Sequence, residues 1–297
     1  MLEHLIEIAT RVTEGRPDDV AFPTAVEGLT LLRSDHERNP NLVLYRPALC
    51  AVIQGAKRTM FGELEIKCGP GEAVLVGITT LGLGRVVEAS PTEPYLGLVI
   101  EIDMATLREV LEEIDAPSAM DEPVRVGIFP VDFGGPLLDC ARRMVGLLDT
   151  PRAIPTLAPA IMREICYWLL TGPRGGEVCR LARVSGSTRA IVDSIRILRE
   201  RFSEPVRVEE LAKAANMSLS AFHLRFKALT ATSPLQYQKQ MRLHEARRLL
   251  LGSDTNVESV AFQVGYESPS QFSREYSRTF GLSPRRDAVG RRQILGS

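Results

Sequence analysis

The chain has 297 residues, 44% of them hydrophobic and 25% charged, a composition typical of a globular protein with about two domains. It has no apolar run of the ~18–20 residues that a membrane-spanning helix needs, and its amphipathic acidic start differs from a signal peptide, so we expect a cytoplasmic protein. The net charge of −1 is unevenly distributed: residues 187–297 carry 18 Lys and Arg against 11 Asp and Glu, a net +7, which leaves −8 for residues 1–186. The basic part indicates either a polyanion-binding surface or a solvated basic surface.

Residues 27–103 show short Val-, Ile- and Leu-rich runs separated by Gly, Pro and Asn. Their spacing of roughly 8–12 residues predicts a β-sandwich or barrel, an architecture that commonly encloses a small-molecule cavity. Helical periodicity follows at 104–114, 134–149 and 157–172. We expect these helices to cover the barrel, or alternatively to face a second copy of the chain.

Catalytic and metal-binding patterns are scarce in this first half. Its only histidines are His4 and His36, and it contains no G-x-S-x-G elbow or Gly-rich phosphate loop. The five cysteines of the chain are scattered without a C-x-x-C pair, which argues against a disulfide framework and a zinc site. We therefore predict that the protein is not an enzyme, uses no cofactor or metal, and binds any ligand without turnover.

Four glycines and a proline within 171–188 predict a linker at 173–187 between a domain of residues 1–172 and a domain of residues 188–297. The second domain is expected to be all α. Together with the first, this gives an α+β protein: a β-barrel with trailing helices, followed by a helical domain.

Residues 206–234 predict a helix-turn-helix. Asn216 tolerates the left-handed backbone of a tight turn, and Ser218 suits the N-cap of a second helix. Phe222 and Phe226 lie four residues apart in that helix and are expected to face inward. The outward face of such a helix is the one that enters a DNA major groove.

The same pattern returns about fifty residues later. SLSAFHLRF at 218–226 is echoed by SPSQFSREY at 268–276, and Gly265 stands where Asn216 stood. A long amphipathic helix at 236–252 separates the two units. A rigid connection of this kind would fix the spacing of two DNA readers, for which one turn of DNA is roughly 34 Å.

Residues from about 190 to 284 resemble the double helix-turn-helix DNA-binding domain of the AraC/XylS family of bacterial transcription regulators. The motifs LAKAANMSLSAFHLRFK, SPLQYQKQMRLHEARRLL and VAFQVGYESPSQFSREYSRTFGLSP carry this resemblance. The stretches at 45–63 and 88–103 are similar to the regulatory domain of one branch of the family. This implies a cupin-like barrel that binds an effector and often dimerises.

The resemblance also implies which outward residues of the two recognition helices touch DNA. Base contacts are expected from Ser220, His223, Leu224, Ser270, Gln271 and Arg274, and phosphate contacts from Lys227 and Arg278. Arg274 suits guanine and Gln271 suits adenine, whereas Leu224 offers only an apolar contact, so the second helix should carry more of the base reading. After Pro284 the chain lacks the aromatic-Arg pair usual in the family, so the packing of the last helix is not predicted.

These observations predict a transcription regulator controlled by a small-molecule effector. Its expected partners are double-stranded DNA, the effector, a second copy of the chain and RNA polymerase. One alternative is a thiol-based sensor of electrophiles that uses Cys50 or Cys68, which lie close in sequence to Lys57, Arg58 and Lys67. An alternative of another class, a cupin-type metalloenzyme, is disfavoured by the shortage of histidine in the barrel.

Overall fold

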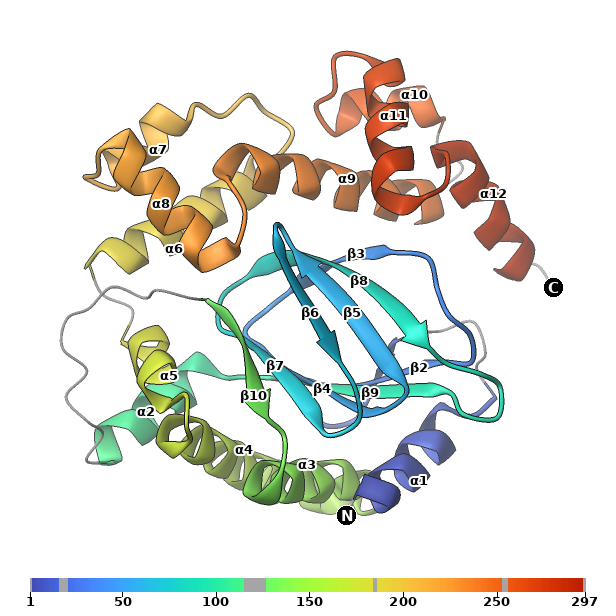
Figure 1. Cartoon of the computed structure of the whole chain (residues 1–297), viewed down its shortest axis with the longest axis vertical. Helices are drawn as coiled ribbons and strands as arrows, with labels where there is room; N and C mark the ends of the chain where they lie inside the picture. The colour runs from blue at the N-terminus through green and yellow to red at the C-terminus, as the bar shows by residue number, and fades with distance from the viewer. Residues whose placement is uncertain (1, 16–20, 115–126, 184–185, 253–255, 296–297) are drawn as a thin grey trace.

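The Val-, Ile- and Leu-rich runs of the first half form two antiparallel sheets that face one another (Figure 1). The computed structural model describes residues 2–15, 21–114, 127–183, 186–252 and 256–295. One sheet has the order β1-β2-β9-β4-β7-β10, with bounds Ala21–Pro23, Leu29–Ser34, Tyr95–Glu101, Ala48–Gln54, Glu72–Val76 and Ile128–Asp132. The other has the order β3-β8-β5-β6, with bounds Asn41–Tyr45, Thr80–Glu88, Ala56–Phe61 and Leu64–Cys68. The expected sheet-rich first half is confirmed as a two-sheet structure, called here the β domain.

Amphipathic helices cover the outer face of the six-stranded sheet (Figure 1). Helix α1 packs directly on β2, β4 and β9, and it contacts α3, which in turn contacts α4. Helix α2 follows β9 and is capped by Asp103, whose carboxylate accepts from the backbone N–H groups of Ala105 and Thr106. The bounds are Leu2–Thr13 for α1, Met104–Glu113 for α2, Gly135–Gly146 for α3 and Ile154–Thr171 for α4. These helices therefore cover the sheet, as the default interpretation expected.

The segment predicted as a linker, 173–187, is mostly helical. Helix α5 spans Gly175–Ala182 and buries Val178 and Leu181 against the β domain. Gly77 leaves room for this contact, because a Cβ there would lie 2.3 Å from Leu181 Cδ1. Within the segment expected to be a linker, residues 175–182 are therefore helical, because an apolar stripe of spacing i, i+3, i+4 packs on the β domain.

The second half is all helical, as predicted. Two helix-turn-helix units, α7–α8 and α10–α11, lie on either side of the long helix α9 (Figure 1). Helix α9 contacts α6, α8, α10 and α12, and it also contacts β3 and β8 of the four-stranded sheet. The bounds are Gly186–Glu200 for α6, Val208–Ala214 for α7, Leu219–Thr230 for α8, Pro234–Gly252 for α9, Val257–Gln263 for α10, Pro269–Phe280 for α11 and Pro284–Leu295 for α12. None of the helices in the described ranges combines the length and apolar character needed to cross a membrane.

The last helix is held by one buried carboxylate. Asp287 on α12 accepts a hydrogen bond of 2.7 Å from the hydroxyl of Tyr276 on α11. It also forms an ion pair of 2.8 Å with Nε of Arg247 on α9, and the Arg247 guanidinium lies 4.5 Å from the ring centroid of Phe280. Asp287 thus links three helices, and it stands in the stretch that departs from the family pattern.

We predict that Asp287→Ala destabilises the helical half by about 3 kcal/mol, because it leaves a mostly buried guanidinium and a buried phenol without their partner. Urea unfolding followed by circular dichroism measures the change. The matched control is Glu200→Ala, which removes an exposed pair with Arg196 and should cost under about 1 kcal/mol. Equal effects of the two substitutions would contradict this role of Asp287.

Candidate nucleic-acid interface and ligand pocket

The first recognition helix, α8, is oriented by its cap, its turn and two buried rings. Ser218 accepts from the backbone N–H of Ala221 at 3.3 Å, and Asn216 takes the left-handed conformation at φ 52°. Phe222 and Phe226 are fully buried. These features match the sequence prediction, and they direct the opposite face of α8 toward solvent.

The second recognition helix, α11, repeats this construction. Ser268 accepts from the backbone N–H of Gln271 at 3.3 Å, and Pro269 occupies the first turn. Gly265 has φ 90°, and a Cβ there would lie 2.1 Å from the carbonyl oxygen of Ser203, so only glycine fits this turn. The predicted anchors Phe272 and Tyr276 are both fully buried.

The outward residues predicted to touch bases lie on the exposed faces of the two helices. Leu224 is the most exposed large apolar side chain on α8, at 74%, while His223 is half-buried. On α11, Gln271 donates to Glu275 at 3.4 Å, and Arg274 forms no ion pair within the described ranges. The exposed members of the predicted set are Ser220, Leu224, Lys227, Ser270, Gln271, Arg274 and Arg278. Their contacts with DNA remain predictions.

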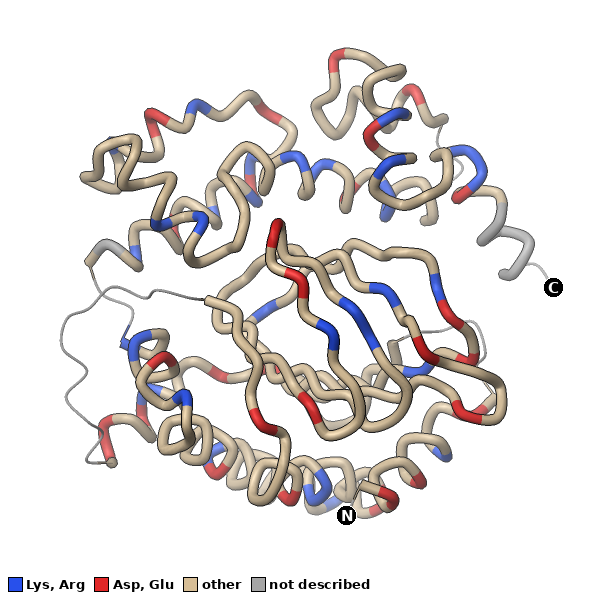
Figure 2. The backbone as a smooth tube through the Cα atoms, in the orientation of Figure 1, with Lys and Arg blue, Asp and Glu red and all other residues tan. Residues whose placement is uncertain are grey.

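One predicted phosphate contact is already paired with a carboxylate. Lys227 Nζ lies 2.7 Å from Glu63 Oε2, in the turn between β5 and β6. Figure 2 shows this acidic turn close to the helical half. The Glu63 carboxylate therefore neutralises the ammonium of Lys227 in this structure. No sequence pattern predicts this pair, because its members are 164 positions apart.

Further contacts seat the helical half on the four-stranded sheet. Gly62, at φ 59°, approaches the end of α8 so closely that a Cβ would lie 2.0 Å from the carbonyl oxygen of Ala231. Ala231 itself is left-handed at φ 59°, where the second unit has Gly281 at φ 75°. On α9, Nδ1 of His244 lies 3.0 Å from the carbonyl oxygen of Leu42. The two halves therefore meet along β3, β8 and the β5–β6 turn.

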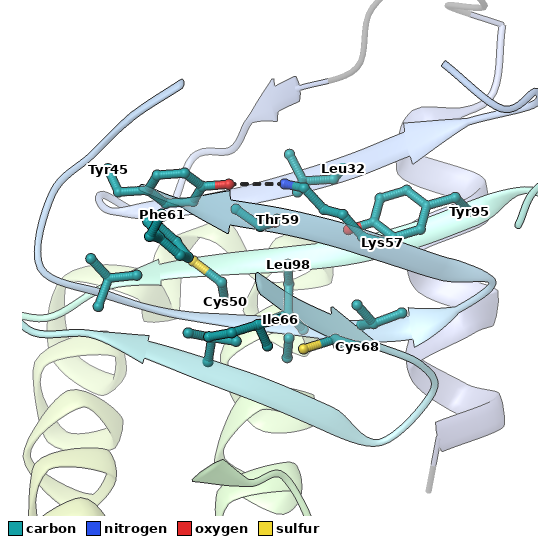
Figure 3. Close-up of a pocket in the computed structure, with 14 residues that line it drawn as sticks. Leu32, Tyr45, Cys50, Lys57, Thr59, Phe61, Ile66, Cys68, Tyr95 and Leu98 are labelled. Atoms are coloured by element: carbon teal, nitrogen blue, oxygen red, sulfur yellow. Dashed lines mark hydrogen bonds between the residues drawn. The ribbon is translucent and has the colours of Figure 1, made fainter. Parts of the chain in front are cut away.

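A small cavity of about 30 Å³ lies between the two sheets (Figure 3). Its polar groups come from Tyr45, Lys57, Thr59 and Tyr95, and the Lys57 ammonium donates to the Tyr45 hydroxyl at 3.1 Å. The remaining lining is apolar or sulfur-containing: Leu32, Cys50, Ala51, Val52, Phe61, Ile66, Cys68, Val74, Val76 and Leu98. The sequence analysis noted Lys57 only as a neighbour of the cysteines. The strand periodicity that points Lys57 inward was a signal that could have identified it.

The cysteines of this cavity lack the setting of a reactive thiol. Burial raises the pKa of Cys50 to about 11, and it also raises the pKa of Cys68. A redox-sensing or electrophile-sensing cysteine needs a lowered pKa so that the thiolate is populated near neutral pH. The geometry therefore does not support the thiol-sensor alternative. Within the described ranges, no group of three or more His, Cys, Asp and Glu side chains is placed to hold a metal ion.

Comparison with known proteins gives consistent matches to both halves. Residues 25–177, just over half of the chain, match the family model described as AraC-type transcriptional regulator N-terminus, and residues 211–287 match a helix-turn-helix domain. The HTH-type transcriptional activator RhaS of Salmonella schwarzengrund is 33% identical over 164 residues, covering 54% of this chain and 57% of that protein. RhaS of Escherichia fergusonii is 37% identical over 155 residues, covering 52% of this chain and 55% of that protein. The matches thus span little more than half the length of these curated relatives.

A solved structure shares the fold over nearly the whole chain. ToxT from Vibrio cholerae strain SCE256, solved with an unsaturated fatty acid bound, aligns with a TM-score of 0.59. The alignment covers 92% of this chain and 96% of that one at 9% sequence identity. At this identity the similarity concerns the arrangement of the two halves and not the residues of any site.

We predict that Cys50 resists alkylation in the folded protein. With a pKa of about 11, about one thiol in a thousand is ionised at pH 8, against about a quarter for an ordinary thiol of pKa ~8.5. Iodoacetamide labelling followed by peptide mass spectrometry should give a rate more than a hundredfold below that of the same cysteine in urea-unfolded protein. A folded-state rate equal to the unfolded one would reinstate the thiol-sensor alternative.

Proposed function

The chain belongs to the AraC family of transcription regulators, and from this premise we propose that it is a sequence-specific DNA-binding regulator that responds to a small molecule held in the β domain. The observation that carries the proposal is the pair of capped recognition helices on either side of α9. Each helix buries aromatic anchors and leaves its opposite face exposed, as a helix that enters a major groove requires; that face is polar on α11, whereas on α8 it includes Leu224. In this proposal the protein binds DNA in the cytoplasm and does not catalyse a reaction.

The second helix is proposed to carry most of the base reading. Arg274 and Gln271 are exposed one turn apart on α11, and their side chains match the major-groove edges of guanine and adenine. On α8 the equivalent face offers Leu224, which suits only a thymine methyl, together with Ser220 and His223. Arg278 and Lys227 are proposed to contact phosphates and so to position the helices without specifying sequence.

A second copy of the chain and RNA polymerase are the further proposed partners. The exposed apolar side chains Leu157 and Tyr167 on α4, 46% and 40% exposed, support a contact between copies through this helix. The description of the curated relatives as transcriptional activators supports a contact with polymerase.

Selection of bound sequences from random duplex DNA tests the proposal. We predict enrichment of one motif, and competition anisotropy should show that the motif binds at least a hundredfold more tightly than scrambled DNA at physiological salt. Arg274→Ala should weaken binding to the motif by about 1–3 kcal/mol and relax its sequence preference at one position. Arg278→Ala is the matched control, because loss of a phosphate contact should weaken binding to all sequences alike. Failure to enrich any motif would refute the proposal.

We also predict that Glu63→Gln strengthens binding to DNA of any sequence by up to about fivefold, because an exposed ion pair contributes at most ~1 kcal/mol. Because Lys227 is then free to neutralise one more phosphate, the slope of log affinity against log salt concentration should become more negative by about 0.9. The matched control is Glu65→Gln, two residues further on, where the carboxylate pairs with Arg58 and should leave affinity unchanged. Equal behaviour of the two variants would contradict a competing role for Glu63.

A further inference from the structure

Lys57 is a lysine that points into the interior of the β domain. Along β5 the side chains alternate, so that Lys57, Thr59 and Phe61 face the opposite sheet while Arg58 and Met60 are exposed. The hydrogen-bonded register of β5 with β8 places Lys57 opposite Val86. The strand therefore fixes the ammonium at the cavity between the sheets, beside Tyr45 and Tyr95 (Figure 3).

The Lys57 ammonium has no carboxylate partner within the described ranges. Its one hydrogen bond goes to the hydroxyl oxygen of Tyr45, and the Tyr45 ring centroid lies 5.6 Å away. Three other lysines of the chain each pair with a glutamate: Lys67 with Glu88, Lys227 with Glu63 and Lys239 with Glu275. Placing a cation between two sheets without a counter-ion is unfavourable, and an anion that enters the cavity would remove this cost.

Two hydroxyl groups complete a set of donors around the ammonium. Because Lys57 donates to the Tyr45 oxygen, the hydroxyl proton of Tyr45 is left for an acceptor in the cavity. Burial raises the pKa of Tyr95 to about 12, so its hydroxyl stays protonated at neutral pH. An ammonium flanked by two phenol O–H groups is a recognition set for a carboxylate.

Glycines on the neighbouring strands make room for this set. A Cβ on Gly84 would lie 2.8 Å from Cε of Lys57, and a Cβ on Gly82 would lie 2.8 Å from Cε2 of Tyr45. A Cβ on Gly97 would lie 2.7 Å from the Tyr95 hydroxyl. Any residue other than glycine at these three positions would therefore fill space that Lys57, Tyr45 or Tyr95 occupies.

We propose that this cavity is the effector site and that its ligand is a small monocarboxylate. The carboxylate would be held by Lys57 with the hydroxyls of Tyr45 and Tyr95, and the apolar body would lie among Ile66, Val74 and the other aliphatic side chains of the lining. The cavity of about 30 Å³ has room for about two water-sized groups, enough for the carboxylate group alone. The apolar body would need the space that opens when Phe61, which lines the cavity, is displaced. The assignment rests on the proposed function, because it names the ligand class of that effector site.

A wider cleft elsewhere on the β domain suits an anion poorly. It has a volume of about 660 Å³ and lies between α4 and the start of α2. Three carboxylates, those of Glu27, Glu101 and Asp103, are in its wall beside Met144 and Met162. Their negative charge would repel a carboxylate, whereas the cavity at Lys57 would attract it.

The cavity is also connected to the helical half. Phe61 lines the cavity and directly precedes Gly62 and Glu63, the turn that meets α8. Ala231, at the end of α8, packs on the same hydrophobic cluster as Phe61 and Tyr95. A ligand that displaces Phe61 would therefore act on the contact between the two halves. Such a ligand would have different affinities for the two arrangements of the halves, as a regulatory ligand requires.

Isothermal titration calorimetry on the full chain tests the assignment with isobutyrate and benzoate, each compared with its primary amide. We expect saturable binding of at least one acid at one site per chain, with the neutral amide at least tenfold weaker. Lys57→Met should weaken binding of that acid at least tenfold while keeping the length of the side chain. Lys67→Met, on the exposed face of the adjacent strand, should leave it unchanged.

Tyr45→Phe provides a second test that keeps the ring in place, and it should weaken acid binding severalfold. The assignment is overturned if neither acid binds saturably, if acid and amide bind equally, or if Lys57→Met binds as tightly as the unmodified protein. Acid binding is measured without DNA. A chain that bound acid but selected no DNA motif would therefore refute the proposed function and not this site.

Discussion

Helix α9 is the element on which the arrangement of the whole molecule depends. Its Tyr237 is fully buried against Phe226 of the first helix-turn-helix, with ring centroids 5.7 Å apart. Its Arg247 joins the second unit through Asp287 and also donates to Asn41 of β3 at 2.8 Å. A single stiff helix therefore fixes the two recognition helices relative to each other and to the four-stranded sheet. Helix α9 therefore contacts both helix-turn-helix units and the four-stranded sheet at once.

The β5–β6 hairpin is the second element shared by the two halves. Its inward residues line the cavity, while its turn contacts the end of α8 through Gly62 and Glu63. This contact is weak, because an exposed ion pair and one close backbone approach contribute little free energy. A weak contact suits a regulator, because a ligand of ordinary affinity can shift an equilibrium of only a few kcal/mol. Ala231, beside this contact, is left-handed at φ 59°, a conformation that costs an alanine more than the glycine found at the matching position 281.

The helix-turn-helix units could be predicted from sequence because their determinants are local. The caps Ser218 and Ser268, the turn residues Asn216 and Gly265, and the spacing of the buried rings all lie within one short segment. The contacts between the halves could not be predicted, because Lys227 and Glu63 are far apart in sequence and carry no shared pattern. The glycines near 175 predict irregular structure, but the packing of Leu181 against Gly77 holds this segment as helix α5. The inward direction of Lys57 follows from strand alternation, but its neighbours Tyr45 and Tyr95 come from two other strands, and no sequence pattern places them beside it.

In the proposed complex, α9 holds two DNA readers at a fixed spacing on one face of the duplex. Hydroxyl-radical footprinting of the full chain on its selected DNA motif measures this directly. We expect two protected patches on the same face of the duplex, about one turn or 10–10.5 base pairs apart. A single protected patch, or two patches on opposite faces of the duplex, would contradict it.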